Sequence, residues 1–158
     1  MRVGTGWDIH PLVEGRDLIL GGVTIENPKG CAGHSDGDAL LHAIIDAMLG
    51  AAGLEDIGTQ FPDTDETYRD ISSLTLLRVA HDLVRENGYN VVNVDSTVIL
   101  QSPKLASYKN EMCIRIARAL DLDEDCVSVK AKTAEHMLCE LGRSDAVVAQ
   151  AAVLLEEN

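Results

Sequence analysis

The chain has 158 residues, a formal net charge of -13 and a hydrophobic content of 46%. This length favours one domain, residues 1–158, around a single hydrophobic core. The excess negative charge argues against a nucleic-acid groove or an anionic membrane surface as the partner. A small phosphorylated ligand stays compatible with this charge, provided that metal ions, backbone N–H groups or a few local cations offset the repulsion.

The sequence shows no signal for export or membrane insertion. Residues 1–4 lead directly into a strand pattern rather than into the apolar stretch of a signal peptide. No run approaches the roughly 20 apolar residues that span a bilayer. The four cysteines form no C-x-x-C pair. We therefore expect a cytoplasmic protein with free thiols and no membrane partner.

The N-terminal segment predicts strands. Residues 2–10 alternate so that Asp8 and His10 share one face, because alternate side chains of a strand point the same way. Residues 17–25 predict one or two short strands around a Gly-Gly turn. Asp8 and His10 should thus lie side by side.

A polar, glycine-rich loop over 26–37 separates these strands from an apolar helix over 38–52. Ser35 or Asp36 can cap this helix by accepting hydrogen bonds from its first N–H groups. Gly53 is placed to end it.

The second half of the chain alternates helices and strands after a polar loop over 55–70. A helix over 72–87 is predicted, ended by Gly88, with His81 on its surface. Its buried stripe is predicted to be Leu76, Val79, Ala80, Leu83 and Val84. Strands are expected over 89–101, with Val92, Val94, Val98 and Leu100 on one face, over 126–132 and over 146–155. A further helix is expected over 103–120.

This interleaving predicts an α/β-type sandwich. The closing strand, 146–155, is apolar on both faces. Helices on one side of a sheet cover only one of these faces. The uncovered face would exceed what a soluble monomer usually exposes, so we expect a homo-oligomer.

Asp8, His10 and His42 form the most informative set of side chains. Two imidazoles and one carboxylate are a usual ligand set for a catalytic zinc with one open coordination position. The same set also holds non-haem iron, and the spacing does not separate zinc from iron or manganese. The alternative is that each histidine is a hydrogen-bonded structural residue.

Two carboxylates flank His42 on its helix. Asp38, His42 and Asp46 are spaced i, i+4, i+8 and share a face. Asp38 or Asp46 could hold the second nitrogen of a metal-bound His42. The alternative is a solvated acidic stripe in which Asp38 caps the helix.

Two polar segments suit a phosphorylated polyol. The segment 56–65 is rich in acceptors for hydroxyl groups, although turns capped by aspartate explain it equally simply. At the end of strand 126–132, Lys132 and Thr133 could hold a phosphate, and Glu135 could hold a magnesium ion that bridges phosphates. The alternative is an ordinary polar strand end.

Eight different short motifs are distributed along residues 1–155. In order, they are Gly6-Trp7-Asp8-Ile9-His10, His34-Ser35-Asp36-Gly37-Asp38, Leu41-His42-Ala43, Asp56-Ile57-Gly58, Phe61-Pro62-Asp63-Thr64-Asp65, Asn93-Val94-Asp95, Gln101-Ser102-Pro103-Lys104 and Val129-Lys130-Ala131. Together they make the chain resemble the 2-C-methyl-D-erythritol 2,4-cyclodiphosphate synthases of non-mevalonate isoprenoid biosynthesis.

The resemblance implies an α+β fold, an α/β sandwich with a mixed sheet and helices on one face. It implies a chorismate-mutase-like subunit that forms a homotrimer with active sites between neighbouring subunits. The implied reaction is phosphorus–oxygen lyase chemistry: 4-diphosphocytidyl-2-C-methyl-D-erythritol 2-phosphate cyclises to 2-C-methyl-D-erythritol 2,4-cyclodiphosphate and releases CMP.

The resemblance also implies residue roles. Zinc would bind Asp8, His10 and His42, and magnesium or manganese would bind Glu135 and the substrate phosphates. His34 and Thr133 would contact the reacting phosphates as catalytic residues. The implied substrate-binding residues are Ser35, Asp56, Ile57, Gly58, Phe61, Pro62, Asp63, Thr64, Asp65, Leu100, Gln101, Ser102, Pro103, Lys104, Leu105, Ala106, Ala131, Lys132 and Arg143.

The chain departs from the family around Glu135. The family commonly has Thr-Thr-Thr-Glu and then Gly-Phe-Thr-Gly-Arg-Gly-Glu-Gly. Here residues 132–145 read Lys-Thr-Ala-Glu-His-Met-Leu-Cys-Glu-Leu-Gly-Arg-Ser-Asp. The Gly-Arg pair lies one residue later and the phenylalanine is missing. The resemblance extends to Arg143, and it assigns nothing to Cys139.

Two other functions fit the same ligand set. A metal-dependent phosphodiesterase or pyrophosphatase would need a general base and a water channel, and it would hydrolyse the substrate rather than cyclise it. A non-catalytic trimer that binds nucleotides or isoprenoid diphosphates would show affinity without turnover.

Overall fold

The computed structural model describes residues 1–62 and 64–158. Its strands are β1 (Arg2–Glu14), β2 (Leu18–Leu20), β3 (Val23–Ile25), β4 (Lys29–Cys31), β5 (Tyr89–Ile99), β6 (Val127–Lys132) and β7 (Ala146–Glu157). Its α-helices are α1 (Ala39–Ala52), α2 (Ile57–Gln60), α3 (Ser73–Glu86) and α4 (Lys109–Ala119). Short 3-10 turns occupy Glu66–Tyr68, Glu124–Cys126 and Leu141–Arg143.

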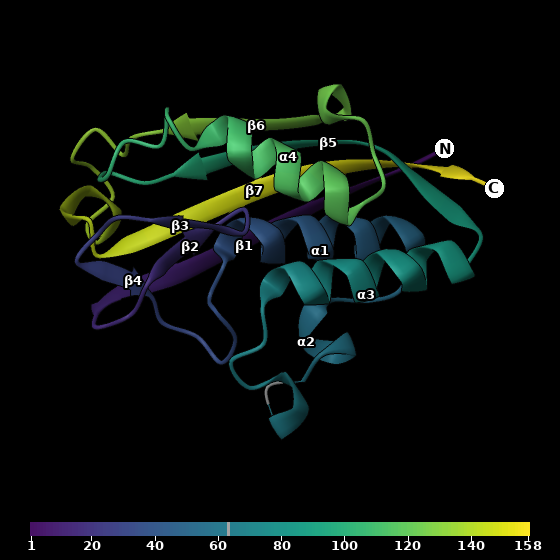
Figure 1. Ribbon diagram of the computed structural model, residues 1–158, viewed down its shortest axis with the longest axis horizontal. Helices are drawn as coiled ribbons and strands as arrows, with labels where there is room; N and C mark the ends of the chain where they lie inside the picture. Colours follow the sequence, from purple (N-terminus) through teal and green to yellow (C-terminus); the bar gives the residue numbers. More distant parts are fainter. Residues whose placement is uncertain (63) are drawn as a thin grey trace.

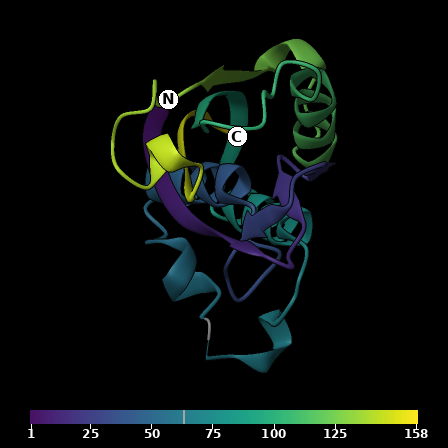
Figure 2. The same cartoon turned by 90° about the vertical axis from the view of Figure 1, so that its left-hand side faces the viewer.

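The main sheet is mixed, with the strand order β4-β1-β7-β5-β6. Only β5 and β6 pair in parallel; the other neighbours are antiparallel. The helices α1, α3 and α4 lie on one side of this sheet (Figure 1), and the turned view shows the sheet curving around them (Figure 2). This is the α+β arrangement that the resemblance implies.

Two glycines of β1 let α1 approach the sheet closely. A Cβ atom on Gly6 would lie 1.9 Å from the carbonyl oxygen of Ala43, and one on Gly4 would lie 2.0 Å from that of Ala47. No side chain fits there, so the helix backbone rests directly on the strand. His42 follows Leu41 on this helix and is thereby brought over the same face of β1 that carries Asp8.

Several boundaries differ from the sequence predictions. β4 and α2 form in segments predicted to be loops. The helix expected from residue 103 begins only at Lys109, because the preceding segment turns to place Leu105, 4% exposed, in the core. A register shift between Val91 and Asn93 buries Val91 rather than the predicted Val92.

The buried stripe of α3 is rotated from the predicted one. Its buried residues are Ser73, Leu76, Leu77, Ala80, His81 and Val84. Val79 is 41% exposed, whereas His81, predicted to lie on the surface, is only 6% exposed. His81 lies one turn after Leu77, on the side that faces the core, and burial lowers its pKa.

The sheet face opposite the helices is left uncovered in the single chain. β1 exposes Val3, Trp7 and Ile9 there, at 72%, 57% and 47%. Neighbouring positions of β7 add the half-buried Ala152 and Leu154. This is the uncovered apolar face expected from the closing strand. None of the helices in residues 1–62 and 64–158 has the length and apolar character needed to cross a membrane.

Candidate metal centre

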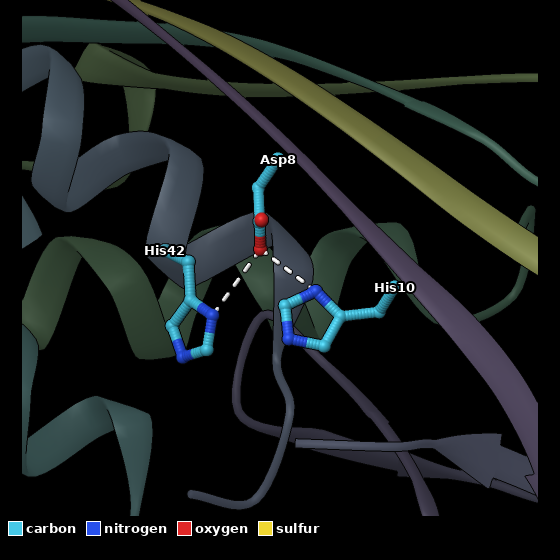
Figure 3. Close-up of side chains that lie close together, drawn as sticks. All are labelled: Asp8, His10 and His42. Atoms are coloured by element: carbon cyan, nitrogen blue, oxygen red, sulfur yellow. Dashed lines mark hydrogen bonds and ion pairs between the residues drawn. The ribbon is translucent and has the colours of Figure 1, made fainter. Parts of the chain in front are cut away.

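Asp8, His10 and His42 converge where β1 passes α1 (Figure 3). Asp8 Oδ2 lies 2.9 Å from His10 Nδ1 and 3.2 Å from His42 Nδ1. One candidate ligand atom from each side chain falls within 4.8 Å of the others. The two imidazole rings are tilted by 50°, with centroids 5.2 Å apart. Asp8 and His42, 34 positions apart in the chain, thus lie side by side.

The donor set fits a divalent metal. His10 Nδ1 is buried and has no hydrogen-bond partner in the part of the chain that the structure describes, although Asp8 Oδ2 lies beside it. Zinc bonds to nitrogen and oxygen of roughly 2.0–2.2 Å place tetrahedral ligand atoms roughly 3.3–3.6 Å apart. The spacing around Asp8 is close to that value, so a small movement would complete the geometry.

The electrostatics of the centre favour a cation. Burial raises the pKa of Asp8, but its close contacts with the His10 and His42 imidazoles outweigh it, so that this pKa lies well below its usual range. Burial lowers the pKa of His42, but Asp8 outweighs it and leaves this pKa raised. Asp8 therefore stays ionised, and a positive charge between Asp8 and His42 is stabilised.

The second nitrogen of His42 contacts two serines rather than a carboxylate. His42 Nε2 lies 3.0 Å from Ser73 Oγ and 3.2 Å from Ser35 Oγ. The expectation that Asp38 or Asp46 would hold this nitrogen is not met among the hydrogen bonds of residues 1–62 and 64–158. Both carboxylates instead accept hydrogen bonds from backbone N–H groups.

Asp38 and Asp46 have clear structural roles. Asp38 is fully buried, caps α1 through Leu41 N and accepts hydrogen bonds from Gly21 N and Gly22 N. Asp46 accepts a 2.8 Å hydrogen bond from Ile57 N. Asp38 therefore fixes the β2–β3 turn to the helix, and Asp46 fixes the start of α2.

A cavity of about 290 Å³ adjoins the centre. Its lining comprises His34, Ser35, His42, Ile57, Gly58, Phe61, Tyr68 and Leu76. His34 Nε2 is buried and has no hydrogen-bond partner among the described residues. Ser35, Ile57, Gly58 and Phe61, which the resemblance implied as substrate-binding residues, thus line one cavity with His34 and His42.

Sequence reasoning missed Tyr68, Leu76 and Ser73. Tyr68 lies in a predicted loop, and Leu76 was assigned only to the core. Ser73 opens α3, where a serine is ordinarily interpreted as a cap. No sequence signal distinguishes a core or capping role from a position beside the site, because contact with the site depends on how α3 packs beside α1.

The aspartates at 56 and 65 form hydrogen bonds with neighbouring backbone N–H groups. Asp56 caps α2 through Thr59 N, and Asp65 accepts a hydrogen bond from Thr67 N. Pro62 is half-buried and Thr64 is exposed. Asp63 lies outside the described residues. The capping interpretation thus holds for Asp56 and Asp65, without excluding ligand contacts by their other oxygens.

A second cavity of about 200 Å³ lies beside the ends of β5 and β6. It is lined by Leu100, Pro103, Lys104, Leu105, Ala106, Lys109, Ala131, Lys132 and Thr133. Most of the predicted 100–106 segment is therefore brought together with Ala131, Lys132 and Thr133. Ser102 is exposed, and Gln101 accepts a hydrogen bond from His136 N at 3.1 Å. This cavity shares no lining residue with the first one.

Thr133 and Glu135 lie together next to this second cavity, where the Thr133 hydroxyl donates to the Glu135 carboxylate. His34 lies in the other cavity, so one chain does not gather both predicted catalytic residues in one pocket. Arg143 lines neither cavity and pairs with Glu140 at 2.9 Å and with Asp145 at 3.4 Å. Its nearest partners are acidic neighbours in the divergent loop.

Comparison with known proteins gives concordant results. The sequence profile described as the YgbB family matches residues 1–156. The 2-C-methyl-D-erythritol 2,4-cyclodiphosphate synthase of Neisseria gonorrhoeae is 56% identical over 155 residues, covering 98% of this chain and 96% of that protein.

Two solved structures are similar to the whole chain. The bifunctional IspDF protein of Campylobacter jejuni superposes with a TM-score of 0.94 at 44% identity, covering 99% of this chain and 42% of that one. A 2-C-methyl-D-erythritol 2,4-cyclodiphosphate synthase in a CDP-bound form gives a TM-score of 0.90 at 39% identity, covering 98% and 100%. This chain thus spans less than half of the bifunctional protein and nearly all of the single synthases.

Proposed function

Because this chain belongs to the YgbB family, we propose that it converts 4-diphosphocytidyl-2-C-methyl-D-erythritol 2-phosphate into 2-C-methyl-D-erythritol 2,4-cyclodiphosphate and CMP. The observation that carries this proposal is the convergence of Asp8, His10 and His42 beside the cavity that contains His34. The full-length identity to a synthase of this name supports the choice of substrate. We place the activity in the cytoplasm, in keeping with the free thiols of the described cysteines.

The reaction needs no protein nucleophile. An oxygen of the 2-phosphate attacks the β-phosphorus, the bond from that phosphorus to the oxygen bridging it to the α-phosphate breaks, and CMP leaves with the bridging oxygen. The protein must fold a flexible polyanion so that its two phosphates meet. Such pre-orientation is worth roughly 7–11 kcal/mol in well-aligned reactions.

The residues of the first cavity suit the reacting end of the substrate. Ile57, whose N–H donates to Asp46, and the adjacent Gly58 offer a surface for the methylerythritol. The buried His34 Nε2 and the Ser35 hydroxyl are placed to donate hydrogen bonds to phosphate oxygens. Zinc held by Asp8, His10 and His42 would supply a Lewis acid for a phosphate oxygen.

The second cavity suits the nucleotide. We assign it to the cytidine, since its apolar lining residues Leu100, Pro103, Leu105 and Ala106 are joined by Lys104 and Lys132. Thr133 would contact the phosphates, and Glu135 would hold magnesium or manganese together with them. The CDP-bound synthase supports a cytidine site in this fold.

A trimer would complete the site. One substrate has to occupy both cavities, and the uncovered apolar face of the sheet offers a surface for neighbouring subunits. We propose that three chains associate through this face, so that the metal centre of one subunit works with the nucleotide cavity of the next.

The decisive experiment is a product assay with the authentic substrate, zinc and magnesium. Equal amounts of CMP and cyclic diphosphate are expected. Release of CMP with an uncyclised phosphorylated product would instead indicate a hydrolase, and binding without turnover would indicate a non-catalytic protein. A reaction without added metal, after chelation, is the control.

A further inference from the structure

The loop before α1 and the start of α3 are joined behind the metal centre. Asp36 N donates to Ile71 O at 3.2 Å, and Asp70 N donates to His34 O at 2.9 Å. The Asp36 carboxylate in turn accepts a 2.9 Å hydrogen bond from Ser73 N, the first residue of α3. A negative charge is favourable at this helix end. These contacts hold Ser73 in a defined position.

The Ser73 hydroxyl links Asp36 to His42. Ser73 is 0% exposed, and its hydroxyl donates to Asp36 Oδ1. Ser73 Oγ lies 3.0 Å from His42 Nε2. A serine hydroxyl has a single proton, which here goes to the carboxylate. Towards His42, Ser73 Oγ therefore acts as an acceptor, and the ring proton belongs on Nε2.

A proton on Nε2 leaves Nδ1 of the neutral ring with its lone pair. Nδ1 faces Asp8 Oδ2 at 3.2 Å, so two acceptors point at each other unless a cation lies between them. We propose that Ser73, held by Asp36, is a positioning residue that keeps His42 in the Nε2-protonated form, with Nδ1 free to bind the metal. This role rests on the metal centre of the proposed function.

Ser35 is a second contact of His42 Nε2, at 3.2 Å, and its Oγ also accepts from Gly37 N. No carboxylate receives its hydroxyl proton among the described hydrogen bonds, which leaves that proton for a ligand in the cavity. Ser35 can thus support His42 partly when Ser73 is lost. A reduced metal affinity, rather than an abolished one, is expected without Ser73.

The test is zinc titration of the metal-free protein against a chromogenic chelator. Ser73→Ala should weaken zinc binding roughly 10- to 100-fold, the usual effect of losing the partner of a ligating histidine. The matched control is Ser96→Ala: Ser96 is also buried, at 2%, but its hydroxyl donates to Ser128 O on a neighbouring strand. This control should keep the affinity of the unaltered protein.

The outcomes separate the two proposals. If the unaltered protein takes up no zinc, the metal centre itself is wrong and the role of Ser73 falls with it. If the unaltered protein binds zinc and Ser73→Ala binds within about twofold of it, the positioning role is wrong and the metal centre stands.

A second measurement needs no variant and so covers the case in which Ser73→Ala fails to fold. The ¹⁵N chemical shifts of the His42 ring in the zinc-bound protein should report a proton on Nε2 and the metal on Nδ1. A proton found on Nδ1 instead would overturn the proposal.

Discussion

At the scale of single residues, Asp8 organises the metal centre. It is the shared neighbour of both histidines, and its pKa is held below the usual range, since its contacts with His10 and His42 outweigh the burial that raises it. Both imidazole nitrogens that face it lie at hydrogen-bond distance, yet His10 Nδ1 makes no such bond. Removing any one of the three ligands should therefore remove the metal rather than shift it.

The simplest prediction at this scale concerns His42. His42→Ala should lose the bound zinc and CMP release together, because two remaining ligands do not hold a catalytic zinc. Metal analysis of the purified variant measures this. His81→Ala is the matched control, since it removes a histidine from α3 at a site apart from the centre, and it should retain zinc. Full zinc content in His42→Ala would contradict the ligand assignment.

A second prediction concerns pH. Burial lowers the pKa of His42 but Asp8 outweighs it, so this pKa lies above its ordinary value of 6.5 in the metal-free protein. Zinc must displace the proton, so its affinity should be constant above this raised pKa. Below it, affinity should fall roughly tenfold per pH unit for each proton displaced. The decline should thus begin above pH 6.5. Chelator competition across this range measures it, and an affinity independent of pH would contradict the assignment.

At the scale of elements, the contact between β1 and α1 builds the site. Gly4 and Gly6 allow the helix backbone to touch the strand, and this contact sets the distance from His42 to Asp8. On the other side of His42, Ser73 at the start of α3 contacts the imidazole and is itself held by Asp36 of the 34–36 loop. The geometry of the candidate metal centre is therefore a consequence of how three elements pack.

Substitution of Gly6 tests this packing. Gly6→Ala places a methyl group against the α1 backbone, which should cost about 1–3 kcal/mol of unfolding free energy and weaken zinc binding. Gly50→Ala, in the same helix, meets nothing within 4 Å and should instead stabilise the protein by up to about 1 kcal/mol. Denaturant unfolding and zinc titration measure both. Equal stability of the two variants would show that the close approach does not matter.

At the scale of the whole molecule, the two cavities and the uncovered sheet face point to assembly. Helices cover one face of the sheet, while Val3, Trp7 and Ile9 stay exposed on the other. A metal-bridged substrate would also explain how a protein with a net charge of -13 could act on the polyanion of the proposed reaction. The cations that the protein lacks overall would be supplied locally by metals and by Lys104 and Lys132 beside the second cavity.

Sedimentation tests the assembly. The protein should sediment at about three times its chain mass of 17.0 kDa, and Trp7→Lys should weaken this association because it places charge on the apolar face. Val79→Lys is the control: Val79 has a comparable exposure of 41%, against 57% for Trp7, but lies on α3. It should leave the mass unchanged. A monomeric unaltered protein at micromolar concentration would refute the trimer.

The sequence by itself predicted most of the longer strands and helices and the candidate set of metal ligands. Alternation in 2–10 places Asp8 and His10 on one face, and the helix after residue 38 carries His42, because these periodicities are local properties of strands and helices. Several residues of the family motifs also line the two cavities.

Only the tertiary structure decided which partners each side chain meets. Asp38 and Asp46 share a helix face with His42, but backbone N–H groups of distant loops take their carboxylates, and Ser73 from α3 reaches the imidazole instead. The burial of His81 and the late start of α4 were likewise set by packing. Hydrogen bonds between residues far apart in the chain depend on how the helices pack on the sheet. Local sequence patterns do not predict that packing.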